Sequence, residues 1–177
     1  TLAIIISGLV IVGYTAMGGL KAVIYTDVFQ MGVLFVGIIL LLVPLGLMAV
    51  GGPSALIHHF TQDPVTASYV DWGAVEPKEL IGWFLSVFPV WFISIAAMQR
   101  IIAARNVQVA QRAFLLTGVP IEWPLFAIGS TLVGLIARML MPDLSDPELA
   151  TPMMIMTVLP AGIAGLVIAA YIAAVMS

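Results

Sequence analysis

The chain has 177 residues, of which 62% are hydrophobic and only 8% are charged, and its mean hydropathy is +1.18. A soluble globular domain carries about 25% charged residues, so this composition excludes a cytoplasmic enzyme. Six basic residues spread along the chain cannot form the basic stripe that nucleic acids need, and there is no cysteine for a disulfide or a cysteine metal site. The composition predicts an all-α polytopic membrane helix bundle.

Both ends of the chain lie in apolar sequence. Residue 1 is Thr1 rather than methionine, and no signal-peptide charge precedes the first apolar run. Ser177 likewise lies in an apolar stretch with no polar flank after it. We therefore expect the chain to be a fragment of one transmembrane domain.

The charged residues divide the chain into membrane spans. About 20 apolar residues cross a bilayer, and the runs between charges predict spans at about 1–17, 22–50, 80–99, 113–140 and 152–177. We expect a long external loop with a short surface helix at 53–79, and a short acidic loop at 142–148.

Basic residues predict which loops are cytoplasmic. Lys21 lies between the first two predicted spans, and three arginines lie between the third and fourth: Arg100, Arg105 and Arg112. The remaining loops are mainly acidic and hold only two basic residues, Lys78 and Arg138. We therefore expect the loops after spans one and three to face the cytoplasm.

The last predicted span carries small residues at a spacing of four: Ala161, Gly165, Ala169, Ala173 and Ser177. Such a stripe favours close helix packing. Ala174 lies one turn before Ser177, so its carbonyl oxygen and the Ser177 hydroxyl can point at one spot. Two adjacent oxygens suit a hard cation such as Na⁺, although such an ion takes about six oxygens and needs further ligands from elsewhere.

Two carboxylates lie within apolar sequence. Asp27 is either a functional intramembrane group or an interfacial one tolerated near a helix start. Glu122 lies between two prolines, roughly 12–15 Å along a helix from Arg112. It either faces a cavity or pairs with a neighbouring helix.

The third predicted span has features of a cavity wall. Pro89 predicts a kink, and Trp91 and Ser94 follow it closely. We expect Trp91, Ser94 and Glu122 to line a substrate cavity, although a packing role for the tryptophan is the commoner case. His58 and His59 lie in a loop with no third ligand at metal spacing, so we expect no metal other than sodium.

Three segments resemble the sodium:solute symporter family. Residues 18–30 are similar to its GG-x-x-AV-x-x-TD-x-x-Q signature, and residues 99–106 are similar to its QR-x-x-AA-[KR] loop. Residues 159–177 resemble its LP-x-G-x-x-GL-x-x-A-x-x-x-AA-x-MS helix. The resemblance implies core helices four to eight of a five-plus-five inverted-repeat transporter, with sodium and a small-molecule solute bound at mid-membrane.

The resemblance also implies roles for individual residues. Ala174 and Ser177 match the family's sodium ligands on core helix eight, and Asp27 matches an aspartate linked to cation coupling. Further ligands would come from core helix one, so the remaining transporter helices are expected partners, together with membrane lipid. The implied location is the bacterial cytoplasmic (inner) membrane.

Two departures disfavour a sugar substrate. The sugar branch has an Asn-x-Tyr-Tyr-Trp run where this chain has 87–91, which keeps only Trp91. It also has a lysine near 121–123, where this chain has Ile121, Glu122 and Trp123. The choline branch has a tryptophan at about the position of Ser94, and this chain lacks it. The substrate could still be an organic acid, an amino acid or another small metabolite.

The resemblance implies a sodium-coupled symporter that works by alternating access, and not an enzyme. Two alternatives remain at this stage. Family-like spans are also found fused to histidine kinases, which would make this chain a sensory module. A proton-coupled transporter would use Asp27 or Glu122 instead of sodium.

Overall fold

The computed structural model describes the chain except for Thr1, Asp63, Trp72 and Ser177 and the side chains of some further residues. The residues that it describes form helices and turns without a strand. They divide into two compact units, the first made of Thr1–Pro53 and Ile128–Ser177 and the second of Ser54–Ala127. Each unit is described by itself.

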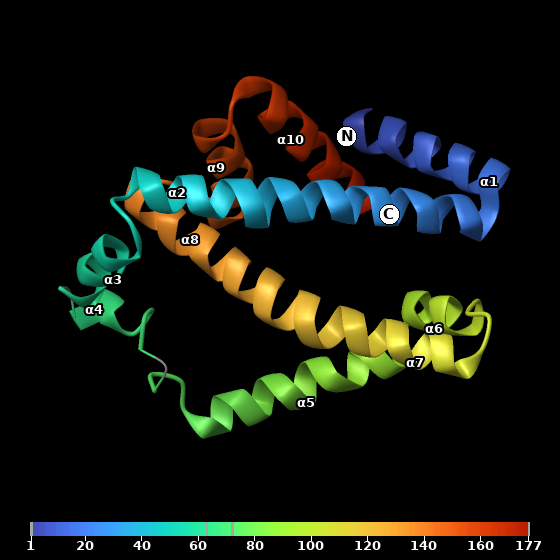
Figure 1. Cartoon of the computed structure of the whole chain (residues 1–177), viewed down its shortest axis with the longest axis horizontal. Coiled ribbons are helices and arrows are strands. Elements are labelled where there is room, and N and C mark those ends of the chain that lie inside the picture. The colour runs from blue at the N-terminus through green and yellow to red at the C-terminus, as the bar shows by residue number, and fades with distance from the viewer. Residues whose placement is uncertain (1, 63, 72, 177) are drawn as a thin grey trace. The chain divides into compact units, whose positions relative to one another are not determined.

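The first unit begins with α1 (Leu2–Leu34), which contains a reversal of direction at Gly19 (Figure 1). Gly19 has φ 60° and ψ −165°, a backbone conformation that a residue with a β-carbon rarely adopts. The glycine pair of the signature therefore joins two helical arms.

After Gly19 the chain forms one long apolar helix. The second arm of α1 continues into a π-helical segment, η1 (Phe35–Leu42), and then α2 (Val43–Ala49). In the part of the chain that the structure describes, Lys21–Ala49 is the one helix long and apolar enough to cross a membrane. Its 29 residues extend about 43 Å at 1.5 Å per residue. It ends where Gly51 and Gly52 take positive φ angles of 88° and 94°.

The rest of the first unit packs against this long helix. It comprises α8 (Ile128–Leu140), the 3-10 turn η3 (Pro147–Leu149), α9 (Ala150–Val158) and α10 (Ala161–Met176). The fully buried side chains of its core are Leu42, Val133, Ile136, Met154, Ile155 and Val167. Glycines bring the helices close, since a β-carbon on Gly46 would lie 3.2 Å from Ile136 Cγ2 and from Met154 Cε.

The expected continuous helix from Pro152 to the C-terminus is two helices. α9 ends at Val158, and Leu159 has extended backbone angles of φ −88° and ψ 146°. The reason is Pro160, because a proline ring disfavours the helical conformation in the preceding residue. The helix that carries the small residues therefore begins at Ala161.

The second unit contains α3 (Pro53–Thr61), α4 (Pro64–Ala67), α5 (Pro77–Ile93), α6 (Ile95–Ile102), α7 (Val107–Leu116) and a π-helical segment, η2 (Thr117–Ala127). Phe60 is buried on α3, and its ring centroid lies 6.0 Å from that of Tyr69. Pro89 is accommodated within α5, and the helix breaks at Ser94 instead (φ −66°, ψ 111°). The side chain of Asn106 caps α7, with its Oδ1 accepting from the Val109 N–H at 2.8 Å.

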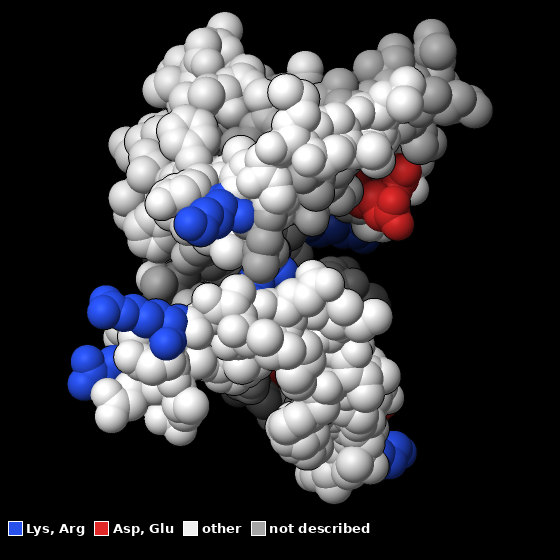
Figure 2. All heavy atoms as spheres, turned by 90° about the vertical axis from the view of Figure 1, so that its right-hand side faces the viewer, with Lys and Arg blue, Asp and Glu red and all other residues white. Residues whose placement is uncertain are grey.

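The surface is strongly apolar. Figure 2 shows few charged side chains among the uncharged ones on the face that it presents. On α5, Phe84 and Phe88 stack with ring centroids 4.6 Å apart, and Phe92 follows at 4.8 Å from Phe88. All three rings are exposed in this chain. Such a helix surface suits lipid or further apolar helices better than water.

Candidate functional site

Two polar side chains on the second arm of α1 share one face of the helix. Asp27 and Gln30 are three residues apart, a spacing that places neighbouring side chains on the same helix surface. Both residues are half-buried, and the atoms Asp27 Oδ1 and Gln30 Oε1 are buried. The hydroxyl of Thr26 donates to the Val23 carbonyl within the same helix at 2.8 Å.

The amide oxygen of Gln30 is the unexpected feature of this face. Gln30 Oε1 accepts no hydrogen bond from the residues that the structure describes. A buried acceptor without a hydrogen bond lowers the stability of the folded protein by about 1–3 kcal/mol. Native proteins therefore usually supply a partner for it. Sequence reasoning included Gln30 in the signature but assigned it no role. The signal that would have found it is its position as the last polar residue before a long apolar run.

The packing face of α10 differs from the expected stripe. Ala164, Val167 and Ala170 are buried within the first unit, whereas Gly165 and Ala169 of the stripe are exposed. An α-helix has 3.6 residues per turn, so positions spaced by four drift around its surface. The face that packs here follows spacings of three instead.

The end of α10 carries the predicted sodium ligands. Ala174 is half-buried near the end of the helix. Ser177 lies outside the described residues, so its role stays a prediction. Asp27 and Ala174 both belong to the first unit, in which α1 and α10 pack against each other.

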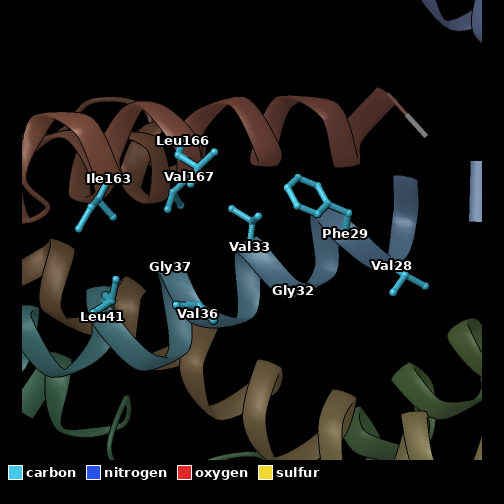
Figure 3. Close-up of a pocket in the computed structure, with 10 residues that line it drawn as sticks. All are labelled: Val28, Phe29, Gly32, Val33, Val36, Gly37, Leu41, Ile163, Leu166 and Val167. Atoms are coloured by element: carbon cyan, nitrogen blue, oxygen red, sulfur yellow. The ribbon is translucent and has the colours of Figure 1, made fainter. Parts of the chain in front are cut away.

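α10 runs antiparallel to the second arm of α1. Figure 1 shows α10 leading from α9 back toward the beginning of the long helix. In the close-up, Ile163 lies over Leu41, and Val167 lies over Gly37 (Figure 3). A β-carbon on Gly37 would lie 3.0 Å from Val167 Cγ1, so this register is fixed by close contact.

The groove between these helices is apolar. Its volume is about 530 Å³, and it is lined by valines, leucines, isoleucine, phenylalanine and glycine from α1, η1 and α10 (Figure 3). A solute site needs a few polar groups that orient the ligand. Because the lining supplies none, the groove is a packing surface rather than a solute site.

The predicted substrate-cavity residues belong to the second unit. Ser94 is half-buried at the break between α5 and α6. Trp91 lies in α5 and Glu122 in η2, but their side chains are outside the described residues. The structure therefore leaves this cavity as a prediction.

The described residues contain no group of three or more histidine, cysteine, aspartate or glutamate side chains placed to hold a metal ion. His58 and His59 are exposed on α3. His58 Nδ1 lies 3.4 Å from Gln62 Nε2, and the His59 ring meets Phe60 edge-on at 5.2 Å. These contacts give both histidines local roles at the surface.

Comparison with known proteins gives one consistent family. The model of the sodium:solute symporter family matches residues 1–177. Human sodium/myo-inositol cotransporter 2 is 29% identical over 93% of this chain, mouse sodium/glucose cotransporter 4 is 31% identical over 93%, and the sodium/pantothenate symporter of Haemophilus influenzae is 28% identical over the whole chain. No solved structure matches significantly.

The matches cover only part of each relative. The chain spans 29% of the two animal proteins and 36% of the bacterial one. The alignment with the human protein is 205 positions long although it covers 93% of a 177-residue chain, so that relative has additional residues inside the matched region. The bacterial alignment needs only 180 positions for the whole chain. With the family model matching from end to end, the chain belongs to the sodium:solute symporter family, whose members are integral membrane transporters and not enzymes.

Proposed function

We propose that the full-length protein is a sodium-coupled symporter of a small organic solute, working by alternating access across the bacterial cytoplasmic membrane. The family match over residues 1–177 carries this proposal. The named relatives are sodium-coupled transporters of small organic molecules. The nearly gap-free alignment with a bacterial symporter supports the bacterial membrane as the location.

Within that protein, we assign this chain to core helices four to eight of the five-plus-five inverted repeat. The predicted spans are those at about 1–17, 22–50, 80–99, 113–140 and 152–177. Two observations support the assignment: the reversal at Gly19 between the first two spans and the packing of α10 against α1. The chain covers about a third of its relatives' length, so the remaining helices are its expected partners.

We propose that sodium binds at the end of α10, with Ala174 and Ser177 as ligands, and that Asp27 couples the ion to transport. The antiparallel packing of α10 on α1 supports this proposal, because it brings the TD-x-x-Q signature and the helix that ends in MS into one unit. A hard cation takes about six oxygens, so the other helices must complete the site.

For the solute, we favour a carboxylate or another small metabolite over a sugar. The identities to the inositol, glucose and pantothenate transporters are nearly equal and do not separate these substrates. The sequence at 87–91 and 121–123 departs from the sugar branch, and the pantothenate symporter aligns with fewer gaps. Pantothenate is therefore the first solute to test.

The experiment is uptake by the full-length protein in proteoliposomes. Labelled pantothenate, myo-inositol and glucose would be offered with a sodium gradient, or with choline replacing sodium under a proton gradient. We expect uptake of one solute only with sodium. Equal uptake in choline would replace this proposal with proton coupling through Asp27 or Glu122.

A further inference from the structure

Gln30 is the deepest polar side chain of the long helix. From Met31 to Ala49 the sequence contains only apolar residues, glycine and proline. With Lys21 at one membrane surface, Asp27 lies about 9 Å and Gln30 about 13–14 Å along the helix. The hydrocarbon core begins some 6 Å inside a bilayer about 43 Å thick, so Gln30 lies within it. Water is scarce at that depth, and the buried Oε1 needs another partner.

The register between α10 and the long helix indicates which part of α10 lies at the height of Gln30. Gly37 of η1 contacts Val167 of α10, and the two helices are antiparallel. Gln30 precedes Gly37 by seven residues, and Ala174 follows Val167 by seven. Seven residues are about two turns of an α-helix, and only Phe35 and Val36 of the residues between Gln30 and Gly37 belong to the wider π-helical segment. Gln30 and Ala174 therefore each lie about two turns from the Gly37–Val167 contact, in the same direction.

Asp27 supplies a negative charge about one helical turn from Gln30. Asp27 is on the same face of α1 as Gln30, and its Oδ1 is also buried. At this height, α1 of the first unit offers a carboxylate oxygen and an amide carbonyl oxygen, and the end of α10 lies in the same unit. Carboxylate and carbonyl oxygens are the ligands that hard cations take.

Resting on the proposed sodium coupling, we propose that the Gln30 side-chain carbonyl is a further ligand of the transported cation, between the carboxylate of Asp27 and the Ala174 end of α10. The cation would replace the hydrogen bond that Oε1 lacks in the described part of the chain. Asp27 would supply the negative charge, and Gln30 would supply a neutral oxygen about one turn deeper along the helix.

Two substitutions of Gln30 in the full-length protein distinguish the effect of its side-chain oxygen from the effect of its volume. Gln30→Met keeps a flexible chain of similar size but removes the carbonyl. Gln30→Glu keeps an oxygen at the same place. Gln62→Met, at an exposed residue directly after α3, is the matched control. The readouts are the sodium concentration for half-maximal uptake and the sodium-dependent rise in melting temperature of the purified protein.

We expect Gln30→Met to raise the half-saturating sodium concentration roughly five- to tenfold, since one oxygen ligand is lost. It should also diminish the thermal shift caused by sodium. Gln30→Glu should stay within about twofold of the unchanged protein or bind sodium more tightly, and Gln62→Met should change nothing. Uptake at saturating sodium should retain its KM for the solute in all variants.

An unchanged sodium curve in Gln30→Met would overturn the inference. So would a melting temperature lowered equally with and without sodium, which would mean that Oε1 bonds to another helix. If Gln30→Met does not fold, Gln30→Asn withdraws the carbonyl by one methylene and should weaken sodium binding in the same direction. Sodium-independent uptake by the unchanged protein would instead remove the proposed function itself.

Discussion

Val167 of α10 occupies the space that a side chain on Gly37 would need. A β-carbon on Gly37 would lie 3.0 Å from Val167 Cγ1 and 3.2 Å from its Cβ. Val167 is fully buried and β-branched, so it has little freedom to turn away. This contact sets the register between the long helix and α10, on which the inferred position of Ala174 relative to Gln30 depends.

Gly37→Ala should therefore destabilise the protein by about 1–3 kcal/mol, the usual range for overpacking a tight contact. The measurement is thermal unfolding of the full-length protein in detergent. Gly32→Ala is the matched control on the same helix, because no atom lies within 4 Å of a β-carbon built there. Gly37→Ala combined with Val167→Ala should regain stability. Equal effects of Gly32→Ala and Gly37→Ala would show that this contact does not fix the register.

Asp27→Asn should impair sodium coupling more than folding. The substitution keeps the size of a half-buried side chain but removes its negative charge. The sodium concentration needed for half-maximal uptake should rise by about tenfold or more, which corresponds to about 1.4 kcal/mol. Expression and the melting temperature without sodium should stay near those of the unchanged protein. If sodium dependence is the same in both proteins, Asp27 has no part in coupling.

The loops after the first and third predicted spans should be cytoplasmic. The chain contains no cysteine, so single cysteines can be introduced and labelled in intact cells. Ala103 is exposed near the end of α6 and avoids disturbing Asn106, which caps α7. Ala103→Cys should resist an impermeant reagent until the cells are opened, whereas Ser145→Cys in the acidic loop should react at once. The reverse pattern would invert the topology.

Short sequence motifs indicated the family, and the apolar runs between charged residues predicted much of the helix pattern. The spans predicted at about 1–17 and 22–50 leave the glycine pair at 18–19 between them, and Gly19 makes the reversal there because its φ of 60° suits glycine. Pro89 and Pro160 have opposite outcomes. Pro160 separates α9 from α10, while Pro89 lies inside α5 and the helix breaks at Ser94. Which proline interrupts a helix depends on packing that a short sequence window does not contain.

The candidate site was harder to predict for the same reason. Asp27 stands out in sequence because it is the one carboxylate among residues 1–62. Gln30 stands out less, because glutamine is common at the surface and its place before a long apolar run is a weak signal, whereas its buried Oε1 marks it in the structure. The face of α10 that packs also depends on where Gly37 admits Val167, so the spacing of small residues alone pointed to a different row.

Sodium activation of uptake by the Ser177→Ala protein tests the central claim most directly, with Ser145→Ala as the control for loss of an exposed hydroxyl. Full-length proteins in proteoliposomes would be compared over a range of sodium concentrations. If sodium binds at the end of α10, Ser177→Ala should raise the half-saturating sodium concentration by about tenfold. Its KM for the solute at saturating sodium should change by less than about twofold, because the solute's own contacts remain. A sodium curve identical to that of the unchanged protein would contradict this account and place the ion elsewhere.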